Sequence, residues 1–405
     1  MTTGAINTTK STSSPATLGA GLVLAIVLVA ANLRATLTGV GTLLPAIEYD
    51  TGLPASWGGF LSTLPLLTFA ATSPFVGRVS HRFGSARVLA LALAVLAAGT
   101  IVRSLPSIAC LFLGTIVLSA AIAFGNVLLP SIIRQSVPSA RIPLISAAYV
   151  TVMGFVAAVS SGISVPLADA LPGSWRTSLA WGLVLAVAAL AVWLPRMRGD
   201  RPAASNDTGH SPTPWKSVLA WQVAVFMGLQ SLGFYTIIAW LPSILAHQGM
   251  DPAGAGWMLF FYQVVALVSS MLLPLVTRGR HDQRFTAAVA SVLVAAGFAL
   301  LLATPGLAVL SCVLLGLGGG ACLVMALSFQ SQRAAGPDES AALAGMAQGV
   351  GYLVAAAGPL LLGVLHDTTR DWTVPLILLI VLNLVMSFFG YGAGRDRHVR
   401  SAVRQ

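Results

Sequence analysis

The chain has 405 residues, of which 56% are hydrophobic and 8% are charged, and its mean hydropathy is +0.86. A soluble domain carries about 25% charged residues, so this composition excludes an ordinary globular domain. The formal net charge of +10 would suggest a nucleic-acid partner in a soluble protein. Apolar runs close to the ~20 residues that span a bilayer recur along the whole length, however, and predict an all-α polytopic membrane protein.

In chain order, residues 1–16 are polar and rich in Ser and Thr, which predicts a disordered cytoplasmic tail. Twelve transmembrane helices are expected to follow. Their predicted ranges are 18–47, 57–77, 87–103, 107–135, 142–167, 175–195, 217–243, 254–276, 285–303, 307–331, 341–364 and 373–393. A polar linker at 196–215 separates the six-helix halves 17–195 and 216–394, and residues 395–405 form a second cytoplasmic tail.

The distribution of basic residues predicts the orientation of the chain. Most of the 22 Lys and Arg residues fall in the tails and in the loops on one side of the twelve helices. Arg103, Arg176 and Arg370 are assigned to the loops on the other side. By the positive-inside rule both termini are cytoplasmic, in a plasma membrane or bacterial inner membrane. The excess of basic residues is therefore explained by the orientation of the chain in the membrane, and no nucleic-acid partner is expected.

The remaining reactive side chains give no sign of an enzyme. All Asp, Glu and His residues fall in predicted loops or at the ends of spans, so a membrane-embedded catalytic cluster is disfavoured. The three cysteines have neither metal-ligand spacing nor the even count of a disulfide framework. We expect neither a metal nor a cofactor.

The second half repeats landmarks of the first half at a shift of about 200 residues. The paired landmarks are Trp57 with Trp257, Pro74 with Pro274, Pro45 with Pro242, and Arg134 with Arg333. Two parallel, pseudo-symmetric six-helix halves joined by a linker are typical of secondary transporters, whose site lies at the midplane between the halves.

Two groups of motifs resemble a known family. The segment GRVSHRFGSAR at 77–87 resembles the signature gating loop between helices 2 and 3 of the major facilitator superfamily, although His81 stands where that loop usually has an aspartate. The gating-loop residues that this resemblance implies are Gly77, Arg78, Arg82, Gly84 and Arg87. The segments ANLRATLTGVGTLLPAI and FGNVLLPSIIRQSVP further resemble the cyanate and nitroimidazole transporter branch (CynX/NimT-like). The resemblance implies a major facilitator fold and a monomer.

Arg34 is the residue from which the function is best inferred. It falls near the middle of the first apolar segment and is the one charge that this assignment cannot place in a loop. A charge at the bilayer centre costs about 2.5–3.5 kcal/mol on insertion scales, so it usually faces a cavity and serves a function. Thr38 shares its helix face, and the repeat places Ser231 and Tyr235 opposite it.

Further polar residues are predicted at depth. Each of them either contacts a solute or only joins neighbouring helices. The candidates are Asn32, Asn126, Tyr149, Tyr262 and Gln348. Asn32 points away from the Arg34 face, which favours a bond to a neighbouring helix, whereas Tyr149 and Gln348 are repeat partners.

The resulting hypothesis is a transporter for a small anionic or polar planar solute that carries a carboxylate, nitro or cyanate-like group. Arg34 would anchor the solute, because its planar fork donates two parallel hydrogen bonds. The alternatives are a structural Arg34 in a multidrug exporter of the same fold, and an anion channel. Uniport or exchange is the simplest mode, and coupling through a span-end acid such as Glu48 stays open.

Overall fold

In the computed structural model, residues 20–138, 141–199, 214–278, 280–335 and 337–399 are described. The first half contains α1 (Ala20–Thr51), α2 (Ala55–Phe83), α3 (Ser85–Arg103), α4 (Ile108–Ser136), α5 (Ile142–Ala170), α6 (Ser174–Ala180) and α7 (Gly182–Trp193). The second half contains α8 (Val218–His247), α9 (Pro252–Val276), α10 (Arg284–Ala303), α11 (Ala308–Gln332), α12 (Pro337–Thr369) and α13 (Thr373–Ala393). Short 3-10 helices are η2 (Leu194–Gly199), η3 (Pro214–Lys216) and η4 (Pro305–Leu307).

The predicted all-α fold of twelve helices in two halves is confirmed. Each predicted range coincides with a helix, and α6 and α7 together form the sixth, which is interrupted at Trp181. Within the described residues, 11 helices are long and apolar enough to cross a membrane, and α2 completes the twelve. Helices suit these sequences because backbone groups in lipid must be hydrogen-bonded within the segment itself.

Several helices extend beyond their predicted ends. α2 continues to Phe83 rather than residue 77, and α12 runs from Pro337 to Thr369 rather than from 341 to 364. Hydropathy marks the apolar thickness of a membrane, whereas a helix continues until the backbone is broken. At the end of α2 that break is Gly84, whose φ of 89° favours glycine.

The predicted tail 1–16 and residues 200–213 of the predicted linker lie outside the described residues. The described start of the C-terminal tail folds back onto the second half. There the Val399 amide donates to the Arg333 carbonyl over 2.7 Å.

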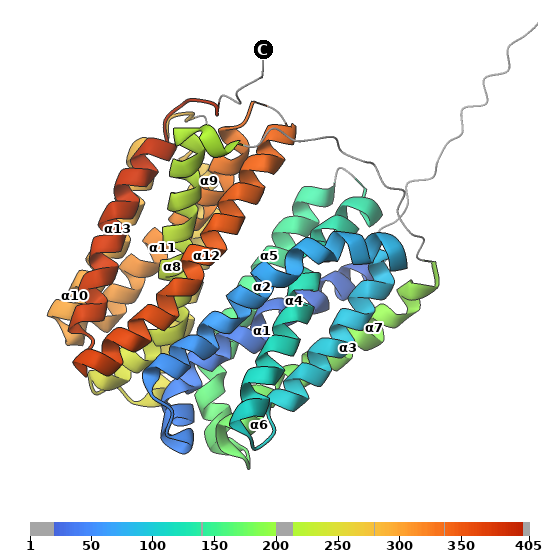
Figure 1. The fold of residues 1–405 in the computed structure, drawn as a ribbon, viewed down its shortest axis with the longest axis horizontal. Coiled ribbons are helices and arrows are strands. Elements are labelled where there is room, and N and C mark those ends of the chain that lie inside the picture. The colour runs from blue at the N-terminus through green and yellow to red at the C-terminus, as the bar shows by residue number, and fades with distance from the viewer. Residues whose placement is uncertain (1–19, 139–140, 200–213, 279, 336, 400–405) are drawn as a thin grey trace, which may run out of the picture.

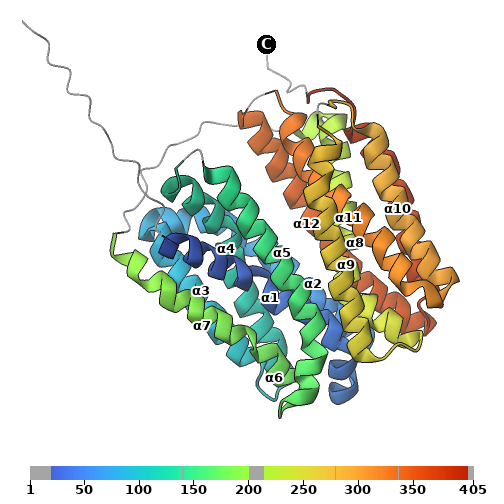
Figure 2. The ribbon, with the colours of Figure 1, turned by 180° about the vertical axis from the view of Figure 1, so that it is seen from behind.

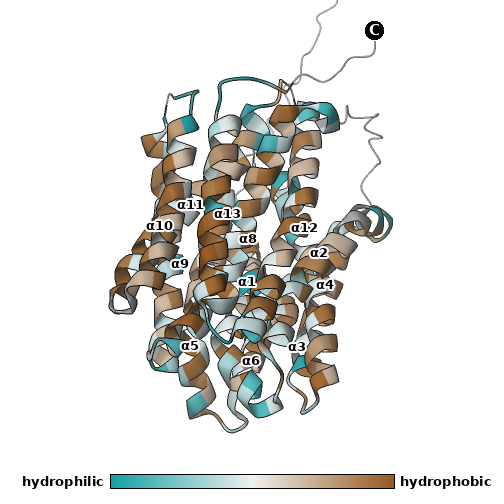
Figure 3. Ribbon diagram, turned by 60° about the vertical axis from the view of Figure 1, so that its left-hand side comes forward, coloured by the Kyte–Doolittle hydropathy of each residue, from teal (hydrophilic) through white to brown (hydrophobic). Residues whose placement is uncertain are grey.

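The two halves lie side by side, with α2 against α12 on one face and α5 against α9 on the other (Figures 1 and 2). We call the end that carries η2, η3 and the C-terminal residues the linker end, and the opposite end the far end. Hydrophobic residues dominate the helices, and hydrophilic residues gather towards the two ends (Figure 3).

The internal repeat is visible in the side-chain packing. At the start of α2, Trp57 and Phe60 pack edge to face with ring centroids 6.0 Å apart. At the start of α9, Trp257 and Phe260 make the same contact at 5.3 Å. The equivalent pairs confirm that the two halves repeat one arrangement of helices.

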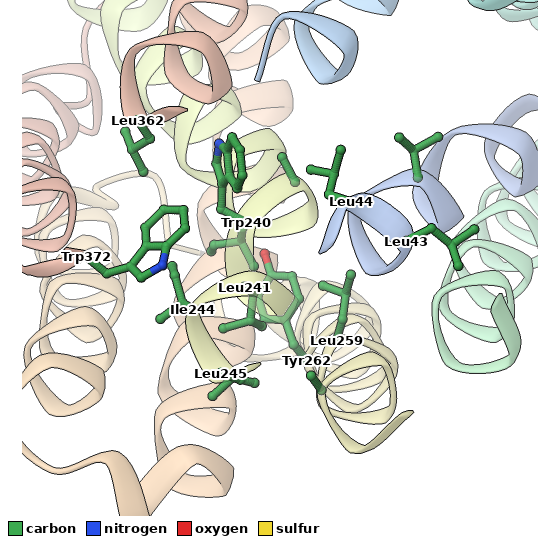
Figure 4. Packing of buried hydrophobic residues seen from close by; sticks show 14 of the residues in the cluster. Leu43, Leu44, Trp240, Leu241, Ile244, Leu245, Leu259, Tyr262, Leu362 and Trp372 are labelled. Atoms are coloured by element: carbon green, nitrogen blue, oxygen red, sulfur yellow. The ribbon is translucent and has the colours of Figure 1, made fainter. Parts of the chain in front are cut away.

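The halves are in close contact at the far end. A Cβ on Gly59 of α2 would overlap the Pro359 carbonyl of α12, and the Thr63 hydroxyl donates to the Ala356 carbonyl over 2.8 Å. In the same core cluster, Trp240 of α8 packs against Trp372 with ring centroids 5.2 Å apart, and Leu44 of α1 belongs to this cluster as well (Figure 4). This end of the molecule is therefore sealed by apolar packing across the two halves.

Close helix contacts also hold α11 in place, and they give a test of the packing. A Cβ on Gly320 would overlap the Ala266 carbonyl of α9, whereas a Cβ on Gly349 of α12 meets nothing within 4 Å. We expect Gly320→Ala to destabilise the purified protein by about 1–3 kcal/mol through overpacking. Gly349→Ala should instead match or slightly exceed the wild-type melting temperature, because alanine favours a helix. Equal melting temperatures for the two variants would contradict the packing described here.

Candidate functional site

Arg34 lies at the boundary between the two halves, halfway along α1. Its Nη1 donates to the Tyr235 hydroxyl of α8 over 3.3 Å. The guanidinium carbon also lies 5.8 Å from the ring centroids of both Phe234 and Tyr235. The side chain is half-buried, and no carboxylate of the described residues lies within 4 Å of it. Arg34 is thus a desolvated positive charge whose nearest described partners are a hydroxyl and two aromatic rings.

Two cavities meet at Arg34. One of about 180 Å³ lies between α1, α5, α8, α9 and α11, and its polar lining includes Thr38, Gln263 and Ser270. The other, of about 40 Å³, lies towards the far end and is lined by Arg34, Thr38, Ser62, Arg103 and Tyr235 among others. The arginine therefore separates a larger space from a small pocket beneath the sealed end.

A third cavity, of about 950 Å³, lies between the halves towards the linker end. Asn126 of α4 and Gln348 and Tyr352 of α12 line it. Tyr352 also lies within electrostatic range of both Arg34 and Tyr235. A chain of polar groups thus leads from the linker end to the guanidinium.

The assignment of Arg103 to a loop is wrong. Arg103 ends α3, and its side chain is only 1% exposed. Its Nη1 donates to the Thr36 carbonyl over 2.7 Å and its Nη2 to the Leu179 carbonyl over 3.0 Å. Hydropathy placed the residue correctly at a span end, but its long side chain turns inward to helix carbonyls. Arg34 is therefore one of two guanidinium groups that line the small pocket.

The structure brings some of the predicted site residues together and places others apart. Thr38 is buried beside Arg34 and donates to the Ala157 carbonyl of α5 over 3.0 Å. Ser231, one turn before Tyr235 on α8, is buried and donates to the Gln230 side chain over 3.3 Å. Asn32 is fully buried and donates to the Leu185 carbonyl of α7 over 3.0 Å.

Four further predicted residues lie at different depths. Asn126 and Gln348 line the large cavity, as described above. Tyr149 packs half-buried against the core of the first half. Tyr262 is fully buried in the second half, where its hydroxyl has no partner among the described residues (Figure 4).

The predicted gating loop is largely helical. Gly77, Arg78 and Arg82 belong to the last turns of α2, Arg87 belongs to the first turn of α3, and Gly84 alone joins the two helices. The Gly84 amide donates to the Ser80 carbonyl over 2.9 Å. The described structure therefore has no free loop between α2 and α3, only this one-residue connection.

Phe234 and Gln263 were not selected from the sequence. Phe234 lies next to a predicted residue on α8, but its ring position depends on how α8 packs against α1. Gln263 of α9 donates to the Ser161 hydroxyl of α5 over 2.7 Å and so joins the two halves beside the cavity. The sequence does show that Gln263 carries an amide in the middle of a predicted span. Such a side chain can line a cavity or join two helices, and the sequence alone does not tell which.

The comparisons with known proteins agree with this architecture. Residues 22–359 match the model of the Major Facilitator Superfamily. A 2-nitroimidazole transporter of Escherichia coli (strain K12) is 41% identical over 94% of this chain and 96% of its own length. The cyanate transport protein CynX of the same organism is 29% identical over 90% of this chain and 96% of its length.

Among solved structures, a bacterial homolog of the human lysosomal transporter Spinster, in an inward-facing and occupied conformation, superposes with a TM-score of 0.78. It is 14% identical, and the match covers 93% of this chain and 96% of that one. At this level of identity the likeness shows the fold alone.

Proposed function

The chain belongs to the Major Facilitator Superfamily, and from that premise we propose that it carries a small anionic or polar planar solute across the membrane by alternating access, anchored by Arg34. Family membership makes it a multi-pass membrane transporter of a small molecule rather than an enzyme. The observation that carries the proposal is the half-buried Arg34 guanidinium, which faces cavities on both sides and has no ion-pair partner among the described residues.

The charge of Arg34 favours an anion or an acceptor-rich group. A buried guanidinium without a counter-charge is costly, and an anionic solute would offset that cost on binding. Carboxylate, nitro and cyanate-like groups suit it, because the planar fork donates two hydrogen bonds to acceptors in one plane. The names of the two relatives, a 2-nitroimidazole transporter and a cyanate transport protein, agree with this class.

The aromatic groups around Arg34 favour a planar solute. Phe234 and Tyr235 pack edge to face beside the guanidinium, with ring centroids 5.3 Å apart and an interplanar angle of 80°. A planar solute held by the fork would lie against one of these rings. Because Arg34 belongs to the first half and both rings belong to the second, a bound solute would contact both halves, which is what alternation about a central site requires.

The same proposal includes orientation and assembly. Arg278, Arg280, Arg395 and Arg397 lie at the linker end, which the positive-inside rule assigns to the cytoplasm. The contact at the far end then makes this the conformation closed to the outside. We propose a bacterial inner-membrane monomer with both termini in the cytoplasm.

A thermal-shift panel on the purified protein tests the solute class. Sodium benzoate, sodium cyanate, 2-nitroimidazole and the lipophilic cation tetraphenylphosphonium are compared on wild type, Arg34→Ala and Arg141→Ala, the last an exposed arginine at the start of α5. A ligand at 100 times its Kd stabilises a protein by about 2.7 kcal/mol. We expect a concentration-dependent rise for at least one anion or nitro compound in wild type and Arg141→Ala, and none in Arg34→Ala.

Two results would contradict the proposal. One is an equal response in Arg34→Ala and wild type. The other is stabilisation by tetraphenylphosphonium alone. Either would favour the multidrug exporter of the same fold, with Arg34 in a structural role.

A further inference from the structure

The first turn of α2 has no cap from its own half. Its N-cap residue is Pro54, which makes no side-chain hydrogen bond to the helix. The first amide groups of a helix have no partner within the helix and need an acceptor when they are buried. The acceptor here comes from the other half. Asp367, near the end of α12, accepts from the Ala55 amide over 3.0 Å and from the Ser56 amide over 2.8 Å.

This cap exists only while the far ends of the two halves are together. Gly363 lies one turn before Asp367, and a Cβ there would be 2.6 Å from the Ala55 carbonyl, so α12 approaches α2 as closely as glycine allows. Carboxylates at helix N-termini are stabilising, because they bind the orphan amides and the positive end of the helix dipole. Separating α2 from α12 would expose both the amides and the carboxylate to solvent.

A second carboxyl group lies at the same contact. Glu48 of α1 lies against α2, where a Cβ on Gly58 would be 2.7 Å from Glu48 Oε1. That oxygen is buried and has no hydrogen-bond partner in the described part of the chain. Glu48 also lies within electrostatic range of Asp367. When ionised, the half-buried Glu48 therefore leaves one buried oxygen unpaired and repels the Asp367 carboxylate across the contact.

We propose that Asp367 is a latch that holds the far end closed by capping α2, and that Glu48 is a proton-binding site that controls this latch. Protonation of Glu48 removes the repulsion and the cost of its unpaired charge while the far end is closed. Opening exposes Glu48 to water, which favours the ionised form and releases the proton. The closed far end therefore binds the proton more tightly, and its population rises as the pH falls.

Other titratable and charged groups surround this contact, and their effects on the pH response must be distinguished from the effect of Glu48. They are His366 on the same helix as Asp367, His247 on α8, Arg370 and Asp371 in the α12–α13 turn, Asp251 at the start of α9, and the Asp50–Arg176 ion pair of α1 and α6. A hydrogen bond from the Thr373 hydroxyl holds the pKa of Asp371 below its usual range, so Asp371 stays ionised in the pH range of the test. Asp50 pairs with Arg176 over 2.7 Å within one half, so this pair does not depend on the latch.

Distances between spin labels test the proposal, which rests on the alternating-access part of the proposed function. Labels on Leu105→Cys and Leu307→Cys report the far end, and labels on Leu144→Cys and Val276→Cys report the linker end, both in a Cys110→Ala background. These positions are exposed and lie away from the latch. One coupled proton changes the ratio of open to closed molecules by up to about tenfold per pH unit.

We expect the far-end pair of the wild type to shift towards longer distances between pH 5 and pH 9. Glu48→Gln should stay closed and lose most of this response, and Asp367→Ala should open at every pH. Asp50→Asn, two residues from Glu48, should respond like wild type. A full pH response in Glu48→Gln, or an unchanged distance distribution in Asp367→Ala, would overturn the proposal.

The linker-end pair separates failure of the latch from failure of alternating access. If the far-end and linker-end distances change reciprocally with pH, and these changes are the same in wild type, Glu48→Gln and Asp367→Ala, the latch is overturned and the proposed function is left intact. If neither pair changes in any variant or at any pH, the alternating-access proposal fails, and the latch fails with it.

Discussion

Replacing Arg34 by alanine is expected to reduce solute flux in proteoliposomes by about 30- to 1000-fold. The change removes a charged donor from a desolvated site, and loss of one partner of a buried charged hydrogen bond costs about 2–4 kcal/mol. Arg34→Lys keeps the charge but loses the two-donor fork, so we expect a smaller loss of about 10- to 100-fold. Initial rates at several solute concentrations would measure both variants.

Arg141→Lys is the matched control, because Arg141 is exposed at the start of α5 and touches none of the three cavities. It should keep the wild-type rate. If Arg34→Ala kept more than about a third of the wild-type flux, the guanidinium would not contribute the expected binding energy, and Arg34 would serve packing alone.

The second large effect is expected where α2 meets α12. Gly59→Val should keep the far end from closing, because the new Cβ would overlap a backbone carbonyl at Pro359 rather than a flexible side chain. Overpacking costs about 1–3 kcal/mol even where neighbours adjust, which would lower the ratio of closed to open molecules by about 5- to 150-fold. Transport needs both conformations, so the flux should fall as the closed conformation becomes rare.

Thiol reactivity makes this effect visible without a known solute. Thr63 is 2% exposed at the closed contact, so Thr63→Cys should react slowly with a membrane-impermeant reagent. Adding Gly59→Val should accelerate the reaction at least tenfold. Gly345→Val on α12, where a Cβ meets nothing within 4 Å, should leave it slow. Equal reactivity in all three proteins would show that the far end does not depend on this glycine.

The fold was predictable because its signals are local. Each apolar run has the length of one membrane span, and the repeated tryptophans near positions 57 and 257 predicted two equivalent halves. Arg34 was predictable for the same reason, since a charge in the middle of an apolar run stands out in the sequence. Its contact with Tyr235 followed from applying the repeat to the Arg34 face.

The rest of the site depends on tertiary contacts that sequence spacing does not contain. Arg103 falls at a span end, where a loop position and an inward-turned side chain look alike in the sequence. Phe234 is one apolar residue among many until α8 packs against α1. Asp367 lies beyond residue 364, the predicted end of its span, and its contact with the α2 amides becomes visible only when α12 meets the uncapped start of α2.

The most direct test of the central claim is solute counterflow into proteoliposomes that contain the purified wild-type protein. Vesicles are loaded with an excess of benzoate, cyanate or 2-nitroimidazole, and uptake of the labelled form of the same solute is followed. We predict transient, saturable accumulation for at least one of these solutes, and its loss in Arg34→Ala. Uptake that rises linearly with concentration, or that is equal in protein-free vesicles for all three solutes, would contradict an Arg34-anchored carrier of small anionic or planar solutes.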